Sequence, residues 1–243
     1  MTTNVVESGS GPKNLPSRML GVIMSPGDTF RSIVAQPRWL DVMIVVTLLL
    51  AALQFWLLST EPGQVAMLDQ QVRQMESFGM TVSDEQYEGM QKGAGAARYF
   101  AAGATIVFGP LMTVAIAGIL YAVFNAALGG TAQFKQVLSV VAHAGVVPLL
   151  SALFATPLNY VRESMTSPTT LAVFLPMLEE ASFAGRLAGL IDLFLIWWAV
   201  VLAIGLAVLY RRKTQPIIIG LLSVYILIVG VIAVVMSSFG GSN

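Results

Sequence analysis

The sequence predicts an all-α membrane protein: a polytopic helical bundle with five transmembrane helices and short interfacial helices at the amino terminus and in the outer loops. Hydrophobic residues make up 56% of the 243 residues and charged residues only 11%, against about 25% charged in an ordinary soluble domain. The chain also contains several apolar runs of about 18 residues or more, the length that a helix needs to cross a ~30 Å hydrocarbon layer.

The amino-terminal segment, residues 1–14, is polar and contains Gly and Ser, which predicts a disordered tail. A helix start follows at Ser25-Pro26 with Asp28 in the first turn, because a cap hydroxyl, an early proline and an early acid all favour helix initiation. Three apolar residues of this helix share one face: Phe30, Ile33 and Val34. This face either lies in the membrane surface, as an interfacial amphipathic helix does, or packs on the protein.

Five apolar stretches are predicted to cross the membrane, at about 41–59, 99–125, 134–156, 188–210 and 216–237. The membrane domain then occupies residues 15–238, and 239–243 form a short tail. Pro110 in the second stretch and Pro148 in the third predict kinks, because proline interrupts the helical hydrogen-bond ladder.

Positive charge predicts the orientation. The fourth and fifth stretches are joined by a tight turn containing Arg211-Arg212-Lys213, and short loops rich in Lys and Arg stay on the cytoplasmic side of a membrane. With the amino terminus inside, eight of the 13 cations fall on the inner segments. The sequence therefore predicts a cytoplasmic amino terminus and a carboxyl terminus outside.

Composition and motifs argue against several functions. The chain has no cysteine and one histidine, so thiolate chemistry and clusters of Cys or His metal ligands are excluded. The net charge is zero, which argues against a nucleic-acid partner. The hydrolase, metalloprotease and phosphate-loop signatures are missing. We therefore expect no enzyme, with no catalytic, metal-binding or cofactor-binding residue and no cofactor.

Four polar residues are candidates for an intramembrane role: Asp192, Arg98, Gln54 and His143. Ionisable groups within a membrane are costly and usually pair with one another. We expect Asp192 to face the bundle and bond to Arg98 or, at a similar depth, to Gln54; the alternative is a carboxylate close enough to the interface to stay hydrated. His143 is either functional or a neutral histidine that is hydrogen-bonded to a neighbouring helix.

Small residues recur every four positions through the second predicted span: Ala97, Ala101, Thr105, Gly109, Thr113 and Ala117. Such a stripe lets helix backbones approach closely, which is how helices associate in lipid. We interpret it as a packing surface, whose partner is either another helix of the chain or a second copy of the protein in a homo-oligomer.

Several motifs together resemble one membrane-protein family. Ser25-Pro-Gly-Asp-Thr-Phe-Arg-Ser-Ile and Gln36-Pro-Arg-Trp-Leu40 resemble the opening of bacterial Yip1-domain proteins. Gly129-Gly-Thr-Ala-Gln-Phe-Lys-Gln-Val-Leu138 with Pro148-Leu-Leu resembles their third span, and Asp192-Leu-Phe-Leu-Ile-Trp197 with Gly205 resembles their fourth. The resemblance extends over about residues 17–238 and implies five-span integral membrane proteins of the bacterial inner membrane. It supplies no residue that would contact a GTPase.

Two hypotheses of function follow. The favoured one is a non-enzymatic membrane protein of Yip1 type that organises the membrane or binds partners, which would be the lipid bilayer and other membrane proteins. The other is a small transporter or lipid-handling protein that uses polar residues such as His143 around a path. The first is favoured because the predicted spans contain few polar groups, and because five spans cannot divide into the repeats typical of transporters.

Overall fold

The computed structural model describes residues 14–179 and 182–239, so the two predicted tails lie outside it apart from Asn14 and Phe239. The described part is almost entirely helical. In chain order the elements are α1 (Leu15–Met24), α2 (Pro26–Ala35), α3 (Leu40–Leu58), α4 (Glu61–Ser77), α5 (Asp84–Tyr121), the π-helix η1 (Ala122–Ala127), α6 (Phe134–Ala144), α7 (Val146–Arg162), the 3₁₀ helix η2 (Leu171–Phe174), α8 (Phe183–Leu190), α9 (Leu193–Tyr210) and α10 (Thr214–Phe239).

Five segments of the described chain are long and apolar enough to cross a membrane. They are α3, α5 with η1, α6 with α7, α9, and α10. This confirms the predicted five-span helical bundle. Three of the bounds differ by five residues or more from those expected from apolarity. Helix α7 continues to Arg162, beyond the predicted end at 156. Helix α5 begins at Asp84, well before the apolar stretch, and α9 begins at Leu193 because α8 ends at Leu190 and Asp192 caps the next helix.

The third span consists of two helices because of one proline. Pro148 has no N–H to donate to the carbonyl four residues earlier, at Ala144, and its ring crowds that carbonyl. Helix α6 accordingly ends at Ala144, and α7 begins at Val146. Gly145 forms the joint, where an added Cβ would lie 2.9 Å from the Ala142 carbonyl oxygen. In the second span, by contrast, α5 continues through Pro110.

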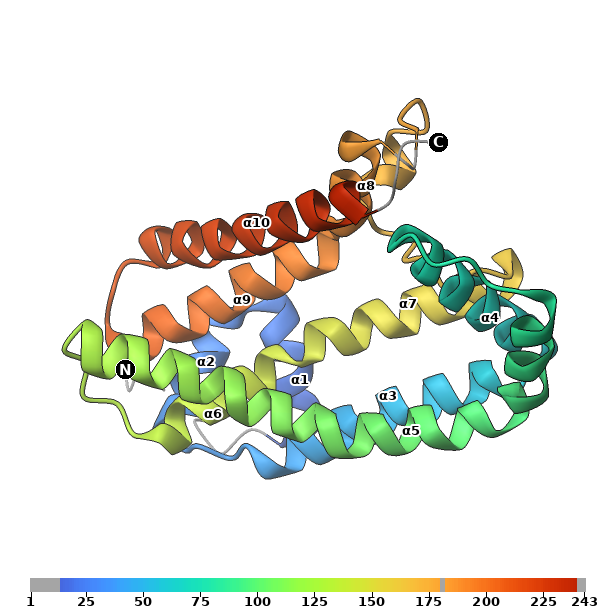
Figure 1. The fold of residues 1–243 in the computed structure, drawn as a ribbon. Helices are drawn as coiled ribbons and strands as arrows, with labels where there is room; N and C mark the ends of the chain where they lie inside the picture. The colour runs from blue at the N-terminus through green and yellow to red at the C-terminus, as the bar shows by residue number, and fades with distance from the viewer. Residues whose placement is uncertain (1–13, 180–181, 240–243) are drawn as a thin grey trace, which may run out of the picture.

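The spans form two groups with the broken third span between them (Figure 1). Helices α9 and α10 pair as a hairpin on one side, and α3 pairs with α5 on the other. Helices α6 and α7 contact both groups. The third span is therefore the most buried of the five: 61% of the residues in its apolar segment are buried, against 11% for α5 and 17% for α10. The outer helices α5 and α10 therefore present most of their surface to lipid.

The short helices α1 and α2 each pack one face against the bundle. Helix α2 packs against α9 and α6, and α1 packs against α2, α6 and α7. Phe30 and Ile33 are completely buried in a core with Val140, Leu202 and Leu206, and Val34 packs against the same cluster. The prediction that Phe30, Ile33 and Val34 form a lipid-facing surface is therefore wrong. The alternative applies, in which the helix packs on the protein.

The stripe of small residues on α5 lies against α3. All six of its residues are buried or half-buried: Ala97, Ala101, Thr105, Gly109, Thr113 and Ala117. A Cβ added at Gly109 would lie 3.8 Å from the Thr47 side chain of α3, and the Thr105 hydroxyl donates to Gln54 of α3 at 2.6 Å. The partner of the stripe is thus a helix of the same chain.

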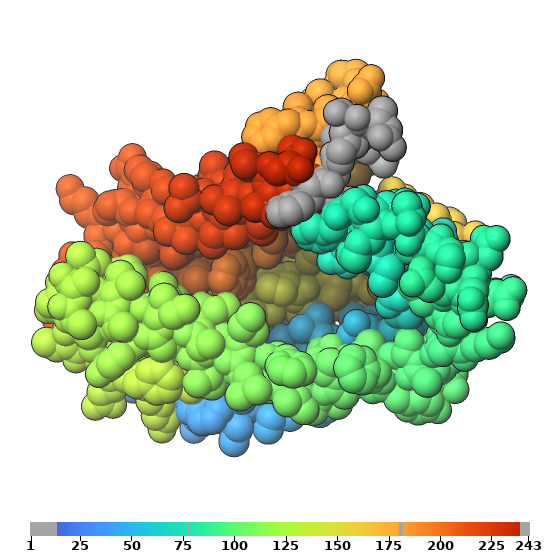
Figure 2. All heavy atoms as spheres, in the orientation of Figure 1, coloured from blue at the N-terminus to red at the C-terminus, as the bar shows by residue number. Residues whose placement is uncertain are grey.

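The space-filling view shows a hollow in the surface between α10 and α5 (Figure 2). Atoms of α7 and α3 are visible at its floor, and α4 borders it on one side. Because the third span separates the two groups of helices, the outer helices of each group do not close over it. Both bordering helices carry large exposed apolar side chains, including Phe108 on α5 and Leu227 on α10.

Candidate functional site

The buried histidine predicted from the sequence belongs to a polar cluster of Arg18, Asp41 and His143, which come from α1, α3 and α6, with Arg18 in the middle. His143 is fully buried, nine residues into α6, about 13 Å along its axis. Its Nδ1 lies 2.7 Å from the Ser139 carbonyl oxygen and its Nε2 lies 3.1 Å from Nη1 of Arg18. A guanidinium can only donate, so Nε2 accepts and the imidazole proton is on Nδ1.

Arg18 connects the three helices of the cluster. Its Nη2 donates to Oδ2 of Asp41 in an ion pair, and its Nη1 donates to the Arg38 carbonyl oxygen at 3.2 Å as well as to His143. Asp41 in turn accepts the Val42 backbone N–H at 2.9 Å. The Arg18 side chain is only 6% exposed, whereas that of Asp41 is 39% exposed. The cluster therefore holds a buried cation by hydrogen bonds from several directions, as a charge in an apolar interior requires.

Arg18 was missing from the candidates predicted from the sequence. It lies in a short segment that precedes the first span, and 125 residues separate it from His143. One signal was present: Arg18 and Val22, four residues apart, share a helix face, and both are buried. An arginine on the buried face of an apolar helix needs an acidic or carbonyl partner.

The hydrogen bonds within the cluster leave His143 no free nitrogen for catalysis or metal binding. Both nitrogens of His143 are occupied, one by a carbonyl and one by Arg18. Among the described residues no group of three or more His, Cys, Asp or Glu side chains could hold a metal ion. The arrangement fastens α1 to α3 and α6, which is a structural use of an intramembrane histidine.

Asp192 has a different set of partners from the one expected. It caps α9, because its Oδ1 accepts the backbone N–H groups of Phe194 at 2.8 Å and Leu195 at 3.4 Å. Its Oδ2 accepts the hydroxyls of Ser167 at 2.6 Å and Thr169 at 2.8 Å. The predicted pairing of Asp192 with Arg98 is therefore wrong, and so is the alternative pairing with Gln54. A carboxylate directly before an apolar run is a helix-capping signal, and it could have been recognised from the sequence.

Arg98 and Gln54 instead belong to the contact between α3 and α5. The Arg98 guanidinium carbon lies 4.8 Å from the centre of the Tyr99 ring and 5.8 Å from that of Phe55, within the range of cation–π attraction. Gln54 accepts the Thr105 hydroxyl. The four predicted polar residues thus occupy three separate places and do not line one path.

The family follows from a comparison with known proteins. A model of the Yip1 domain matches residues 20–236, nearly the whole chain. The chain belongs to the Yip1-domain family. No curated protein and no solved structure matches it. Membership confirms the resemblance seen in the sequence and, with the five apolar helices, shows a multi-pass membrane protein of Yip1 type. Yip1 is not a known enzyme family.

Proposed function

We propose that this Yip1-domain protein is a non-enzymatic membrane component that binds another membrane protein and thereby organises the membrane around it. The observation that carries the proposal is the lateral hollow between α5 and α10 (Figure 2). Lipid tails are as apolar as leucine, so helices associate in a membrane only where they can pack closely. A hollow between two apolar helices offers more contact to a partner helix than a single convex helix does.

The polar groups of the interior support a binding role over transport. Arg18 bonds to both Asp41 and His143, and Asp192 caps α9. A transport path needs polar groups whose bonds a solute can replace. The charged cluster and the capping carboxylate belong instead to contacts that fix helices in place.

Photocrosslinking in the native membrane tests the proposal. Benzoylphenylalanine replaces Phe108, which is 62% exposed, or Leu227, which is 68% exposed, on the two helices that border the hollow. The control is the same probe at Phe30, which is 0% exposed. We expect adducts of one reproducible mass from both exposed positions and none from Phe30, with the partner identified by mass spectrometry.

Each outcome of this experiment distinguishes the two hypotheses. An adduct with a second protein supports the proposal, and an adduct of twice the chain mass identifies that protein as another copy of the chain. Adducts with lipid alone, at both exposed positions, would contradict partner binding and favour the lipid-handling alternative.

A further inference from the structure

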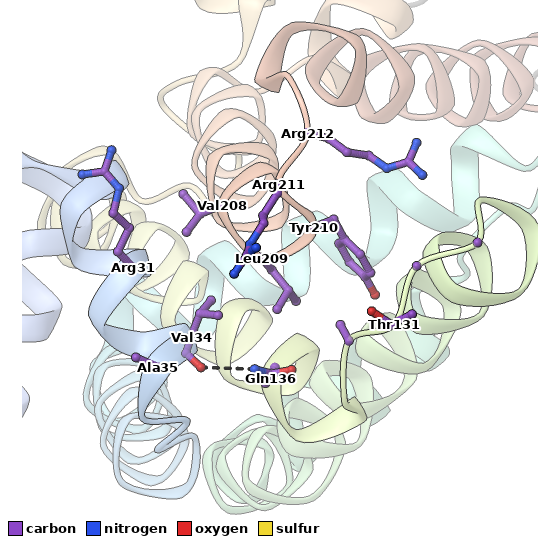
Figure 3. A pocket seen from close by; sticks show the side chains of 13 residues that line it. Arg31, Val34, Ala35, Thr131, Gln136, Val208, Leu209, Tyr210, Arg211 and Arg212 are labelled. Carbon is purple, nitrogen blue, oxygen red and sulfur yellow. Dashed lines mark hydrogen bonds between the residues drawn. The ribbon is translucent and has the colours of Figure 1, made fainter.

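A cavity of about 800 Å³ opens at the end of the bundle that carries Arg211, Arg212 and Lys213, which we call the basic end (Figure 3). Its walls come from α2, from the loop between η1 and α6, from the start of α6, and from the last turn of α9. Helices η1 and α9 end at this end of the bundle, and α6 and α10 begin there. The cavity therefore lies at the level where apolar spans give way to water, which is the level of lipid headgroups.

The loop wall of the cavity is fixed by close contacts. Gly130 lies against the Tyr210 ring, since an added Cβ would come within 2.5 Å of that ring. Asn125 donates to the Ala132 carbonyl oxygen at 2.7 Å and accepts the Tyr210 hydroxyl at 2.8 Å. The Tyr210 ring also stacks on Phe124 with the ring centres 4.7 Å apart. The shape of the cavity is thus set by the protein before any ligand enters.

The charge of the lining is one-sided. It includes Arg31, Arg211 and Arg212 and no acidic residue. Arg31 is paired with Asp28 and points away from the cavity in Figure 3, and Arg212 donates to the Leu128 carbonyl oxygen at 2.6 Å. Arg211 extends between α2 and α9 toward Gln136. Within the described residues its guanidinium forms no hydrogen bond or ion pair.

The backbone conformation at Arg211 is uncommon for a residue with a side chain, and Glu163 at the end of α7 shares it. Arg211 ends α9 in the left-handed conformation, with φ of 52°. Glycine is the usual residue at this position of a helix terminus because a Cβ is unfavourable there. The donors of the Arg211 guanidinium are unused by the described part of the protein, so they are open to a ligand.

We propose that this cavity binds a phosphate group and that Arg211 is its principal donor. A guanidinium presents a planar pair of N–H groups that matches two phosphate oxygens. Beside the arginine, Val34, Val208 and Leu209 supply apolar wall, which suits the glycerol and first methylenes of a phospholipid. The chemistry fits a lipid headgroup or a free phosphate, and it does not depend on the proposed partner binding.

The test uses the full chain in detergent and two probes. Native mass spectrometry measures retention of dioleoyl phosphatidic acid, with the zwitterionic dioleoyl phosphatidylcholine as reference, and calorimetry measures binding of inorganic phosphate. We expect selective retention of phosphatidic acid. Arg211→Gly should weaken it about fivefold, while the unfolding temperature stays the same or rises because the left-handed strain is relieved.

Lys213→Gln is the matched control. It removes one positive charge two residues after Arg211, and the Lys213 side chain does not line the cavity. It should leave retention unchanged. Binding of inorganic phosphate with the same dependence on Arg211 would identify a free phosphate as ligand, and binding of the lipid alone would identify a headgroup. Equal losses from both variants, no loss from Arg211→Gly, or no selective binding of either probe would overturn the proposal.

Discussion

At the scale of single residues, Arg18 joins the helices of the buried polar cluster. It is a guanidinium within the bundle that contacts a carboxylate, an imidazole and a carbonyl from three different segments. A second Asp–Arg pair, Asp28 with Arg31, lies on the surface, where both side chains are about 70% exposed. The chain thus contains one Asp–Arg pair with a buried guanidinium and one in which both side chains are exposed.

The two pairs should respond differently to the loss of their acid. Asp41→Ala leaves the Arg18 charge buried without its counter-ion, so we expect it to lower the free energy of unfolding by about 3 kcal/mol. Asp28→Ala leaves Arg31 in water and should cost less than about 1 kcal/mol. Denaturation in mixed micelles, followed by circular dichroism, measures both. Equal losses would show that Arg18 finds compensation that the structure does not indicate.

The second residue-scale prediction concerns Asp192. Asp192→Asn keeps an oxygen that can cap α9, whereas Asp192→Ala removes it and should cost about 1–2 kcal/mol more. Because Asp192 and Arg98 have separate partners, the losses from Asp192→Ala and Arg98→Ala should add. Unfolding of the two single variants and the double variant tests this, and strong coupling would restore the direct pairing that the structure contradicts.

At this scale, the sequence showed which intramembrane polar residues form bonds. It did not show which residues are their partners. His143 and Asp192 are conspicuous because they interrupt apolar stretches. Their partners are not conspicuous: Arg18 is distant in sequence, and Ser167 and Thr169 lie in a loop with no periodic pattern. Depth along a helix constrains a pairing, but it cannot show which way a loop folds back.

At the scale of elements, the contact of α2 with α9 depends on Gly205. A Cβ at Gly205 would lie 2.5 Å from Cγ1 of Val140 and 3.0 Å from Cε1 of Phe30. The absence of a side chain there lets α2 and α6 approach α9 together. The apolar character of Phe30 is compatible with contact to lipid or to protein. Because Gly205 leaves room on α9, Phe30 packs against the protein.

Gly205→Ala should therefore destabilise the protein by about 1–3 kcal/mol, the range for overpacking a filled core. Gly220→Ala on α10 is the control, because a Cβ there meets nothing within 4 Å. That variant should be neutral or slightly stabilising, since alanine favours helix over glycine. Thermal unfolding of both variants in the same detergent gives the comparison. A neutral Gly205→Ala would mean that α2 can move away at little cost.

At the scale of the whole molecule, the number of spans followed from the sequence, but their arrangement did not. Continuous apolar runs of the right length predict spans because lipid requires every backbone group to be bonded within its helix. The two-group arrangement depends on which faces contact which, and α3, α9 and α10 are apolar on all sides, so the sequence pattern gives no preferred face. The sequence predicted a kink from Pro148, and the structure has a break at Gly145 instead.

Orientation is the whole-molecule property on which the proposed sites depend. We propose that the basic end is cytoplasmic, because Arg211, Arg212 and Lys213 lie in a short loop between two spans. The natural chain has no cysteine, so single cysteines can be introduced without background labelling. Ser83 and Thr166 precede or follow spans at the opposite end, and Thr131 lies in the loop at the basic end; all three are exposed.

In intact cells an impermeant maleimide should label cysteines at Ser83 and Thr166 but not at Thr131. All three should label after the membrane is dissolved in detergent, which controls for accessibility within the fold. Positive charge resists translocation most strongly in short loops, so we expect complete protection of Thr131 rather than a mixture. Labelling of a cysteine at position 131 alone would show that the orientation is the reverse of the proposed one. The arginine-lined cavity would then lie among the headgroups of the outer leaflet.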